Sequence, residues 1–218
     1  MAEFIIHGIP GSPYVRAALL ALEEKRADYR IARLSMGAQK APEHLARHAF
    51  GRVPVLDHGD FRLYETQAIL RYLDRIIPEP PLTPTDAKAE ARMNQFIGVT
   101  DCYVMSDIGR PIVFQRVVAP RNGLPVDEAA LAAALPRAAI CIDEIARLLG
   151  HQSYMAGDAL SLADLVLASH LALLATIEEG RALLAGHANL LAWLDRMNAR
   201  PSMAVTTREA LLRRLEAA

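Results

Sequence analysis

The hydrophobic positions of the first 78 residues or so change their period several times, which indicates alternating strands and helices. A short apolar run, EFIIH at 3–7, is followed by the turn IPGSP and then by YVRAALLALEEK, whose apolar residues recur at helical spacing. The next segment, YRIARLSM, alternates weakly and predicts a second strand. Because a right-handed crossover joins neighbouring parallel strands, this part of the pattern predicts a βαβ unit.

A second group of elements follows in the order helix, strand, strand, helix. APEHLARHA is typical of a short helix, and PVLDH and FRLYE flank the turn HGD as the antiparallel strands of a hairpin. TQAILRYLDRI then has the apolar spacing of a closing helix. Together the two groups predict a small mixed sheet covered by helices, which is an α/β domain.

A cluster of prolines ends this alternation. Four prolines lie close together, at Pro78, Pro80, Pro81 and Pro84. Prolines at this density cannot continue a helix, so they mark a linker. The pattern therefore predicts a first domain at 1–78, a linker at 79–86 and an all-helical second domain at 87–218.

After the linker, the apolar residues recur only at helical spacing. DAKAEARMNQFIGVTDCYVMSDIGRPIVFQRV predicts a long helix with an interruption at Pro111, and DEAALAAALPRAAICIDEIARLLG predicts a helix kinked at Pro136. SLADLVLASHLALLATI is apolar nearly all round, so we expect it at the centre of the helical domain. NLLAWLDRMNARP and an amphipathic segment reaching Arg214 complete the pattern.

The segment GDALSLADL carries a helix-start signal. Ser161 is followed three residues later by Asp164, the spacing of a capping box, in which each side chain satisfies a free backbone N–H group of the first turn. Leu160 and Leu165 flank the cap as a hydrophobic staple. A catalytic role for Asp164 is the alternative, and the sequence favours the capping role.

Composition and charge exclude several classes of function. Hydrophobic residues make up 52% of the 218 residues. The 24 basic and 25 acidic residues leave a net charge of −1. A charge so close to zero gives no electrostatic case for binding nucleic acid or an anionic membrane. No apolar stretch reaches the roughly 20 residues that span a bilayer, and MAEFIIHG does not resemble a secretion signal. Cys102 and Cys141 form no metal-binding or CxxC spacing, so we expect a reduced, cytoplasmic protein without a metal.

One constellation in the first domain points to a small peptide-like ligand. Val53-Pro54 lies between a glycine-led turn and a short strand, where an X–Pro bond can be cis, and a cis bend exposes the N–H and C=O groups of Val53. Glu65-Thr66 stands at the start of the next helix and offers a carboxylate and a hydroxyl. These groups suit the two ends of an extended peptide, whereas a plain structural turn explains Pro54 alone.

Taken together, the motifs resemble the cytosolic glutathione transferases over essentially the whole chain. The resemblance rests on the Val-Pro loop, the proline linker, the helical second half and the GDxxSxAD capping box. It is strongest with the serine-type classes, namely theta, delta, phi and their bacterial relatives, and QKAPEHLARHAFGRVPVLDHGDFRLYETQAILRYL is especially similar to the phi class. It implies a thioredoxin-like N-terminal domain, an all-helical C-terminal domain, a homodimer and a role in detoxification.

The resemblance also implies roles for individual residues. Ser12, in IPGSPYVR four residues before Arg16, matches the catalytic hydroxyl. The implied glutathione-binding residues are Gln39, Lys40, Arg52, Val53, Pro54, Glu65 and Thr66. Thr66 replaces the usual serine and keeps its hydroxyl. Lys40 is alternatively an ordinary surface lysine.

A single hydroxyl is enough to activate glutathione. A cysteine-like thiol with a pKa of about 8.5 is only a few per cent ionised at neutral pH. A hydrogen bond to a charged acceptor contributes roughly 1.5–3 kcal/mol, so one donor lowers that pKa by about one to two units. Ser12 is also placed to cap a helix, and both roles can coexist. Tyr14 is the rival hydroxyl and is favoured as a packing or substrate-side residue, and His7 is expected to be structural.

The second substrate is expected to be a small apolar electrophile bound beside the long first helix of the helical domain. The candidates for its pocket are Tyr14, Tyr103, Met105 and Phe114. Alternative functions are a glutathione-dependent isomerase or peroxidase of the same fold, or a non-enzymatic binding or regulatory protein. A thiol transferase would need cysteine in place of Ser12. The leading interpretation is an enzyme that uses glutathione as co-substrate.

Overall fold

The computed structural model describes residues 3–217. The chain forms two compact units. The first comprises the described residues up to Thr83 together with those from Ala199 onwards, and the second is Pro84–Asn198.

A four-stranded mixed sheet is the centre of the first unit. Its strands are β1 (Phe4–Gly8), β2 (Tyr29–Arg33), β3 (Val55–His58) and β4 (Phe61–Tyr64), in the order β2-β1-β3-β4. β1 and β2 are parallel, whereas β3 pairs antiparallel with both β1 and β4. The predicted parallel pair and the predicted hairpin are both confirmed.

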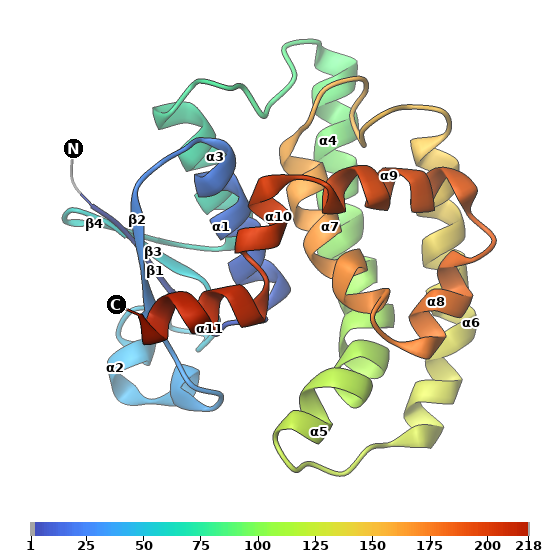
Figure 1. Ribbon diagram of the computed structural model, residues 1–218, viewed down its shortest axis with the longest axis horizontal. Coiled ribbons are helices and arrows are strands. Elements are labelled where there is room, and N and C mark those ends of the chain that lie inside the picture. The colour runs from blue at the N-terminus through green and yellow to red at the C-terminus, as the bar shows by residue number, and fades with distance from the viewer. Residues whose placement is uncertain (1–2, 218) are drawn as a thin grey trace. The chain divides into compact units, whose positions relative to one another are not determined.

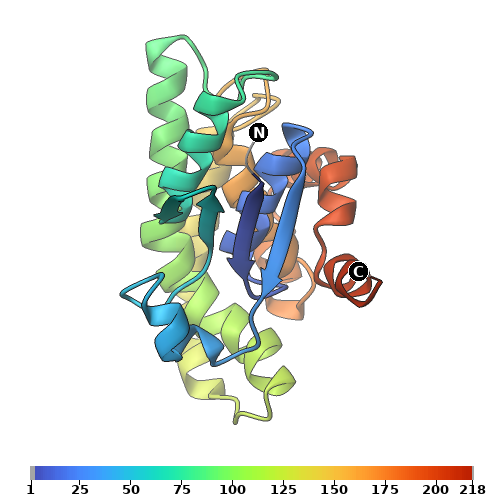
Figure 2. The same cartoon turned by 90° about the vertical axis from the view of Figure 1, so that its left-hand side faces the viewer.

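Two helices cover one face of this sheet and lie behind the strands in Figure 2. They are α1 (Pro13–Glu24) and α3 (Thr66–Ile76), which pack against each other. Leu19 and Leu70 are fully buried on these helices, and Ile6 and Leu56, which are register partners on β1 and β3, are fully buried as well. The apolar residues that set the helical and strand periods therefore form the core of this unit.

The short segment between β2 and β3 contains a 3₁₀ turn, η1 (Ala38–Lys40), and one turn of helix, α2 (Pro42–Leu45). Pro42 stands at the first helical position of α2, where its missing N–H group is not needed. The predicted short helix over APEHLARHA is thus present, although α2 itself covers only its first part.

The end of the chain belongs with the first unit, which differs from the expectation that 87–218 form one domain. α10 (Pro201–Val205) lies beside α1, and α11 (Arg208–Glu216) follows it (Figure 1). Arg200 forms an ion pair with Glu24 at 2.6 Å, and the Ser202 hydroxyl donates to the same carboxylate. These contacts join residues far apart in the chain, so hydrophobic period alone does not reveal them.

The start of the proline-rich linker is tied to α3 by a buried ion pair. Lys25 donates to Asp74 and to the carbonyl oxygen of Pro80, both at 2.5 Å. Asp74 also accepts hydrogen bonds from the Leu82 backbone and the Thr83 hydroxyl. Because these bonds hold 80–83 against the first unit, the chain passes to the second unit only after Thr83.

The second unit is all helical. Its elements are α4 (Ala87–Val99), η2 (Thr100–Val118), α5 (Ala119–Arg121), α6 (Glu128–Leu149), α7 (Leu162–Leu174), α8 (Glu178–Leu184) and α9 (Ala188–Asn198). Almost every residue of α7 is buried, and α7 contacts α4, η2, α8 and α9. Its predicted central position is confirmed.

The predicted interruption at Pro111 is wrong. The helical path continues from α4 through η2, a π-helical stretch that contains Pro111, and into α5. A proline has no N–H group and so leaves one carbonyl of the preceding turn without its usual partner. η2 packs along α6, and α6 likewise runs through Pro136, so packing maintains both helices past their prolines.

The capping box at the start of α7 is confirmed. The Asp164 carboxylate, fully buried, accepts hydrogen bonds from the backbone and hydroxyl of Ser161 at 2.9 and 2.7 Å. It also accepts bonds from the Met155 N–H and the Trp193 indole, both at 2.8 Å. Burial raises the pKa of Asp164, and these donors oppose that shift. With four donors on one carboxylate, Asp164 has a folding role.

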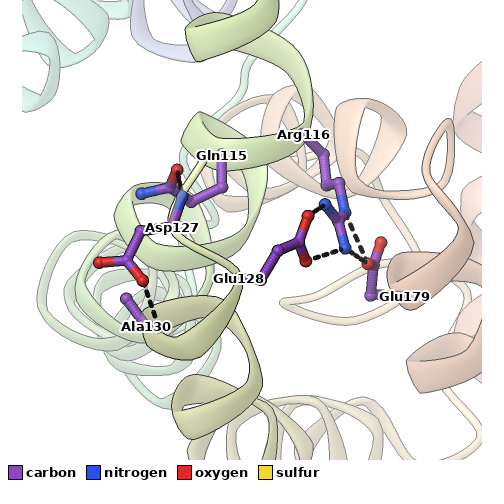
Figure 3. A network of polar contacts seen from close by, with 6 residues as sticks. All are labelled: Gln115, Arg116, Asp127, Glu128, Ala130 and Glu179. Carbon is purple, nitrogen blue, oxygen red and sulfur yellow. Dashed lines mark hydrogen bonds and ion pairs between the residues drawn. The ribbon is translucent and has the colours of Figure 1, made fainter. Parts of the chain in front are cut away.

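A network of polar contacts around Arg116 links helical elements of the second unit (Figure 3). Arg116, near the end of η2, lies between two carboxylates and bonds Glu128 at 2.6 and 2.8 Å and Glu179 at 2.6 Å. Glu128 and Glu179 occupy the first turns of α6 and α8, where a negative charge interacts favourably with the helix dipole. Arg116 therefore joins three helical elements.

Candidate functional site

Ser12 caps the helix that begins at the edge of the sheet. Gly11 has a φ of +95°, which reverses the chain after β1, and Ser12 is the N-cap of α1 with Pro13 at the first helical position. The Ser12 hydroxyl oxygen accepts from the Val15 N–H at a long 3.5 Å. Because the oxygen acts as the acceptor, the hydroxyl hydrogen is left to donate to another group. The capping role and a donor role are compatible here.

The turn that carries Ser12 is covered by the last helix, which sequence analysis did not foresee. A Cβ atom at Gly11 would lie 3.1 Å from Cδ of Arg208 on α11, so the arginine stem packs directly on this turn. One helical turn beyond Ser12, Arg16 donates to the Met203 carbonyl at 2.8 Å and to the Thr206 hydroxyl at 3.4 Å. The pKa of Arg16 is lowered by burial. The chain terminus thus supports the first turn of α1.

The Val53–Pro54 peptide bond is cis, as predicted. Pro54 is buried and Val53 half-buried, immediately before β3 begins at Val55. Among residues 3–217, no backbone hydrogen-bond partner is present for Val53. Its N–H and C=O groups are therefore left for an external partner, which is what an extended peptide ligand needs.

Glu65 has an unusual backbone conformation. Its φ is +72°, whereas residues with a side chain rarely adopt positive φ, and such strain costs of the order of 1–3 kcal/mol. Glu65 is the N-cap of α3, yet its exposed carboxylate does not cap the helix. Thr66, the first helical residue, is buried. A strained residue with an unused carboxylate at a helix N-terminus is well suited to bind a cationic or donor group.

The loop that carries Gln39 and Lys40 contacts the loop before Val53. The Lys40 ammonium donates to the Phe50 carbonyl at 3.3 Å, and a Cβ atom at Gly51 would lie 2.8 Å from the Gln39 carbonyl oxygen. Gly51 has a φ of +58°, so both its conformation and this close approach require glycine. Lys40 and Arg52 are both exposed, and the structure brings these two cations to neighbouring loops.

Two buried histidines lie beneath these loops, and sequence analysis missed both. His44 is 4% exposed, and its Nε2 lies 2.7 Å from the Arg52 carbonyl oxygen. His48 is 2% exposed and stacks on Tyr64, with ring centroids 4.3 Å apart. Within the described residues, His48 Nδ1 has no hydrogen-bond partner. Their four-residue spacing on an apolar segment is the only signal in the sequence.

His7 has a structural partner that its sequence position did not suggest. Its Nε2 lies 2.8 Å from Asp57 on β3, and Arg62 on β4 bonds the same carboxylate through two nitrogens at 2.7 and 2.9 Å. The bonds from Arg62 hold the pKa of Asp57 below its usual range, and burial lowers the pKa of His7. The three residues form a chain of contacts across adjacent strands, which fits the expected structural role.

The candidates for the electrophile pocket divide between the two units. Tyr14 is half-buried on α1 of the first unit. Tyr103, Met105 and Phe114 lie on η2 of the second unit, where Tyr103 and Phe114 are exposed and Met105 is half-buried. Exposed aromatic side chains on one helical element suit an apolar ligand. Their role stays a prediction.

In the part of the chain that the structure describes, no three His, Cys, Asp or Glu residues gather as a metal site. Over the same residues, no helix is both long and apolar enough to cross a membrane.

The parallel β1-α1-β2 unit, the β3-β4 hairpin, α3 and a separate helical unit define a class of proteins that join a thioredoxin-like domain to an all-helical one. The comparisons with known proteins agree with this class. The family model for the glutathione S-transferase N-terminal domain matches residues 2–75, and that for the C-terminal domain matches residues 128–196.

Individual relatives match nearly the whole chain. A probable glutathione S-transferase GSTF2 of Oryza sativa is 34% identical over 93% of this chain and 94% of its own, and glutathione S-transferase 3 of Zea mays is 33% identical over 94% of each. Among solved structures, glutathione S-transferase I with bound lactoylglutathione superposes with a TM-score of 0.84, at 29% identity over 97% of this chain and 100% of that one. The chain belongs to the glutathione S-transferase family and is a glutathione transferase that uses glutathione as co-substrate.

Proposed function

We propose that Ser12 activates glutathione by donating a hydrogen bond to its sulfur, so that the thiolate attacks an apolar electrophile. The observation that carries this proposal is the Ser12 hydroxyl at the start of α1, whose oxygen accepts from the Val15 N–H and whose hydrogen is left to donate. The positive end of the α1 dipole adds to the stabilisation of a thiolate at this position. Ser12 acts as a donor and forms no covalent bond.

Three groups of residues are proposed to hold the rest of the glutathione molecule. Val53 bonds the cysteinyl backbone, a role supported by its unpaired N–H and C=O groups before the cis Pro54. The Glu65 carboxylate and the Thr66 hydroxyl take the γ-glutamyl end. The exposed cations and the amide on the neighbouring loops, Lys40, Arg52 and Gln39, take the glycine carboxylate.

Within the family, we place this chain in a serine-type class, nearest to phi. Ser12 after the glycine turn supports this placement, as do the plant relatives, which include glutathione S-transferases F7 and F14 of Arabidopsis thaliana. We also propose a cytoplasmic homodimer. The two free cysteines of the chain fit a reducing compartment.

The second substrate is proposed to be a small apolar electrophile that contacts Tyr14, Tyr103, Met105 or Phe114. Exposure of Tyr103 and Phe114 on η2 supports an apolar contact surface. A maize relative, glutathione S-transferase I, which is 30% identical, has been solved in complex with an atrazine glutathione conjugate. An aromatic electrophile of this kind is the first to test.

The decisive experiment is a titration of enzyme-bound glutathione, followed by the ultraviolet absorbance of the thiolate. The proposal predicts a thiol pKa about one to two units below the value of roughly 8.5 for a free thiol. Turnover with chlorodinitrobenzene should follow the same ionisation. A bound thiol with the pKa of free glutathione would contradict the role of Ser12.

A further inference from the structure

His44 is buried on α2 and has one hydrogen bond that bears on the proposed glutathione site. Its ring is 4% exposed, and its Nε2 lies 2.7 Å from the carbonyl oxygen of Arg52. Since a carbonyl only accepts hydrogen bonds, Nε2 must carry the proton and donate it. The bond therefore fixes both the His44 tautomer and the direction of the Arg52 carbonyl.

The direction of that carbonyl decides where the Val53 N–H group points. The two groups belong to one planar peptide unit, Arg52–Val53. The cis bonds of the described chain are Val53–Pro54 and Glu79–Pro80, so this unit is trans. In a trans unit the C=O and N–H groups point in opposite directions. With the carbonyl held toward the buried His44, the N–H group of Val53 points away from α2.

The N–H group of Val53 forms no hydrogen bond within the described part of the chain. Val53 is only half-buried. The hydrogen bond from His44 to the Arg52 carbonyl thus directs the Val53 N–H group away from α2.

We propose that His44 is a positioning residue of the glutathione site: it holds the Arg52–Val53 peptide so that the Val53 N–H donates to the cysteinyl backbone carbonyl of glutathione. This inference rests on the proposed function and extends it to a residue that does not touch the ligand. His44 acts on binding, whereas Ser12 acts on the thiol.

Two amide substitutions at the same position separate this role from a general effect on folding. The side-chain amide of His44→Gln places a donor near the position of Nε2, while the shorter amide of His44→Asn does not reach it. Both variants keep a polar side chain, and His151→Asn, at an exposed histidine of the second unit, serves as the control. The Kd for glutathione is measured by calorimetry, and the Val53 amide resonance is followed by NMR as glutathione is added.

The proposal predicts a Kd about three- to tenfold higher for His44→Asn, the loss expected for one peptide hydrogen bond, and a value within twofold of wild type for His44→Gln. The downfield shift of the Val53 amide proton on binding should persist in His44→Gln and disappear in His44→Asn. At saturating glutathione, kcat should change little in either variant.

Equal glutathione affinity in His44→Asn and the wild-type protein would overturn the inference, even if His44→Asn lowered Tm. Equal losses in the Asn and Gln variants would overturn it as well. Failure of the wild-type protein to bind glutathione would instead refute the proposed function, so the two failures are distinguishable.

Discussion

The guanidinium of Arg16 donates to the main-chain carbonyl of Met203, 2.8 Å away, and so joins the first turn of α1 to α10, 187 residues further along the chain. The same guanidinium bonds the Thr206 hydroxyl at 3.4 Å. Because Ser12 caps the helix on which Arg16 lies, the end of the chain supports the turn that carries the proposed catalytic hydroxyl. The structure of this turn depends on the last two helices.

Arg16→Met is therefore expected to destabilise the protein. It keeps the apolar stem but leaves the Met203 carbonyl without its donor, at a cost of about 1–3 kcal/mol. Arg16→Lys, which retains one donor, should lose less. Urea unfolding measures both changes. Equal stability of Arg16→Met and the wild-type protein would show that the contact with α10 adds nothing.

Ser12→Ala is expected to keep glutathione binding and lose most turnover. The cap bond that it removes is long, at 3.5 Å, so its effect on stability should fall at the low end of the range of about 0.5–2 kcal/mol for helix caps. Without the donor, the thiol pKa should rise by about one to two units towards 8.5, so the thiolate fraction and with it the turnover near pH 7 should fall about eight- to twenty-fivefold.

The matched control for Ser12 is Ser12→Thr, which retains a hydroxyl and caps a helix nearly as well. Its turnover should lie above that of Ser12→Ala. Calorimetry with glutathione and turnover with chlorodinitrobenzene are measured on all three proteins. Unchanged turnover in Ser12→Ala would remove Ser12 from the mechanism.

Local signals predicted most of the first unit. The apolar spacing of TQAILRYLDRI coincides with α3, and the turn predicted at HGD joins β3 to β4, with Gly59 and Asp60 between the strands. Each of these elements is determined by residues within a few positions of one another, through the spacing of apolar residues, the turn residues and the helix caps. The place of 199–218 was not predictable in this way, because it depends on ion pairs such as Arg200 with Glu24.

The residues of the candidate site also differ in whether local sequence or contacts between distant residues determine them. The cis bond at Pro54 was predictable from a short motif, the same motif selected Val53 and Glu65 as candidates for binding a peptide-like ligand, and Ser12 was selected by resemblance. His44 and His48 were missed, since their importance arises from contacts with Arg52 and Tyr64 that exist only after folding. A histidine on an apolar helix face gives no sign in the sequence of which loop it will support.

Glu65→Gly and Glu65→Ala should separate binding from backbone strain. Both remove the carboxylate, so both should weaken glutathione binding, which calorimetry measures. At a φ of +72°, alanine keeps the strain of a side chain whereas glycine relieves it, so Glu65→Gly should be more stable than Glu65→Ala by about 1 kcal/mol. A Kd for glutathione that is unaltered in both variants would contradict the binding role of Glu65. Equal stabilities of Glu65→Gly and Glu65→Ala would contradict the backbone strain at this position.

The acid sensitivity of the protein is expected to depend in part on His48. Burial lowers the pKa of His48 below its ordinary value of 6.5, with His44 and Arg52 adding to the shift and Glu65 opposing it. The unfolded chain then binds a proton at a higher pH than the folded one, so stability from the neutral ring is complete above about pH 6.5 and falls as the pH drops through the folded pKa.

His48→Phe tests this dependence, because phenylalanine keeps a ring to stack on Tyr64 and removes the titrating group together with the unpaired Nδ1. Urea unfolding at a series of pH values between 7.5 and 5 should give a shallower loss of stability for His48→Phe than for the wild-type protein. The difference in slope is bounded by about 1.4 kcal/mol per pH unit, the value for one proton. His7 and His170, whose pKa values are also lowered chiefly by burial, titrate in both proteins and cancel in the comparison. Parallel curves would mean that His48 takes up its proton equally in the folded and unfolded states.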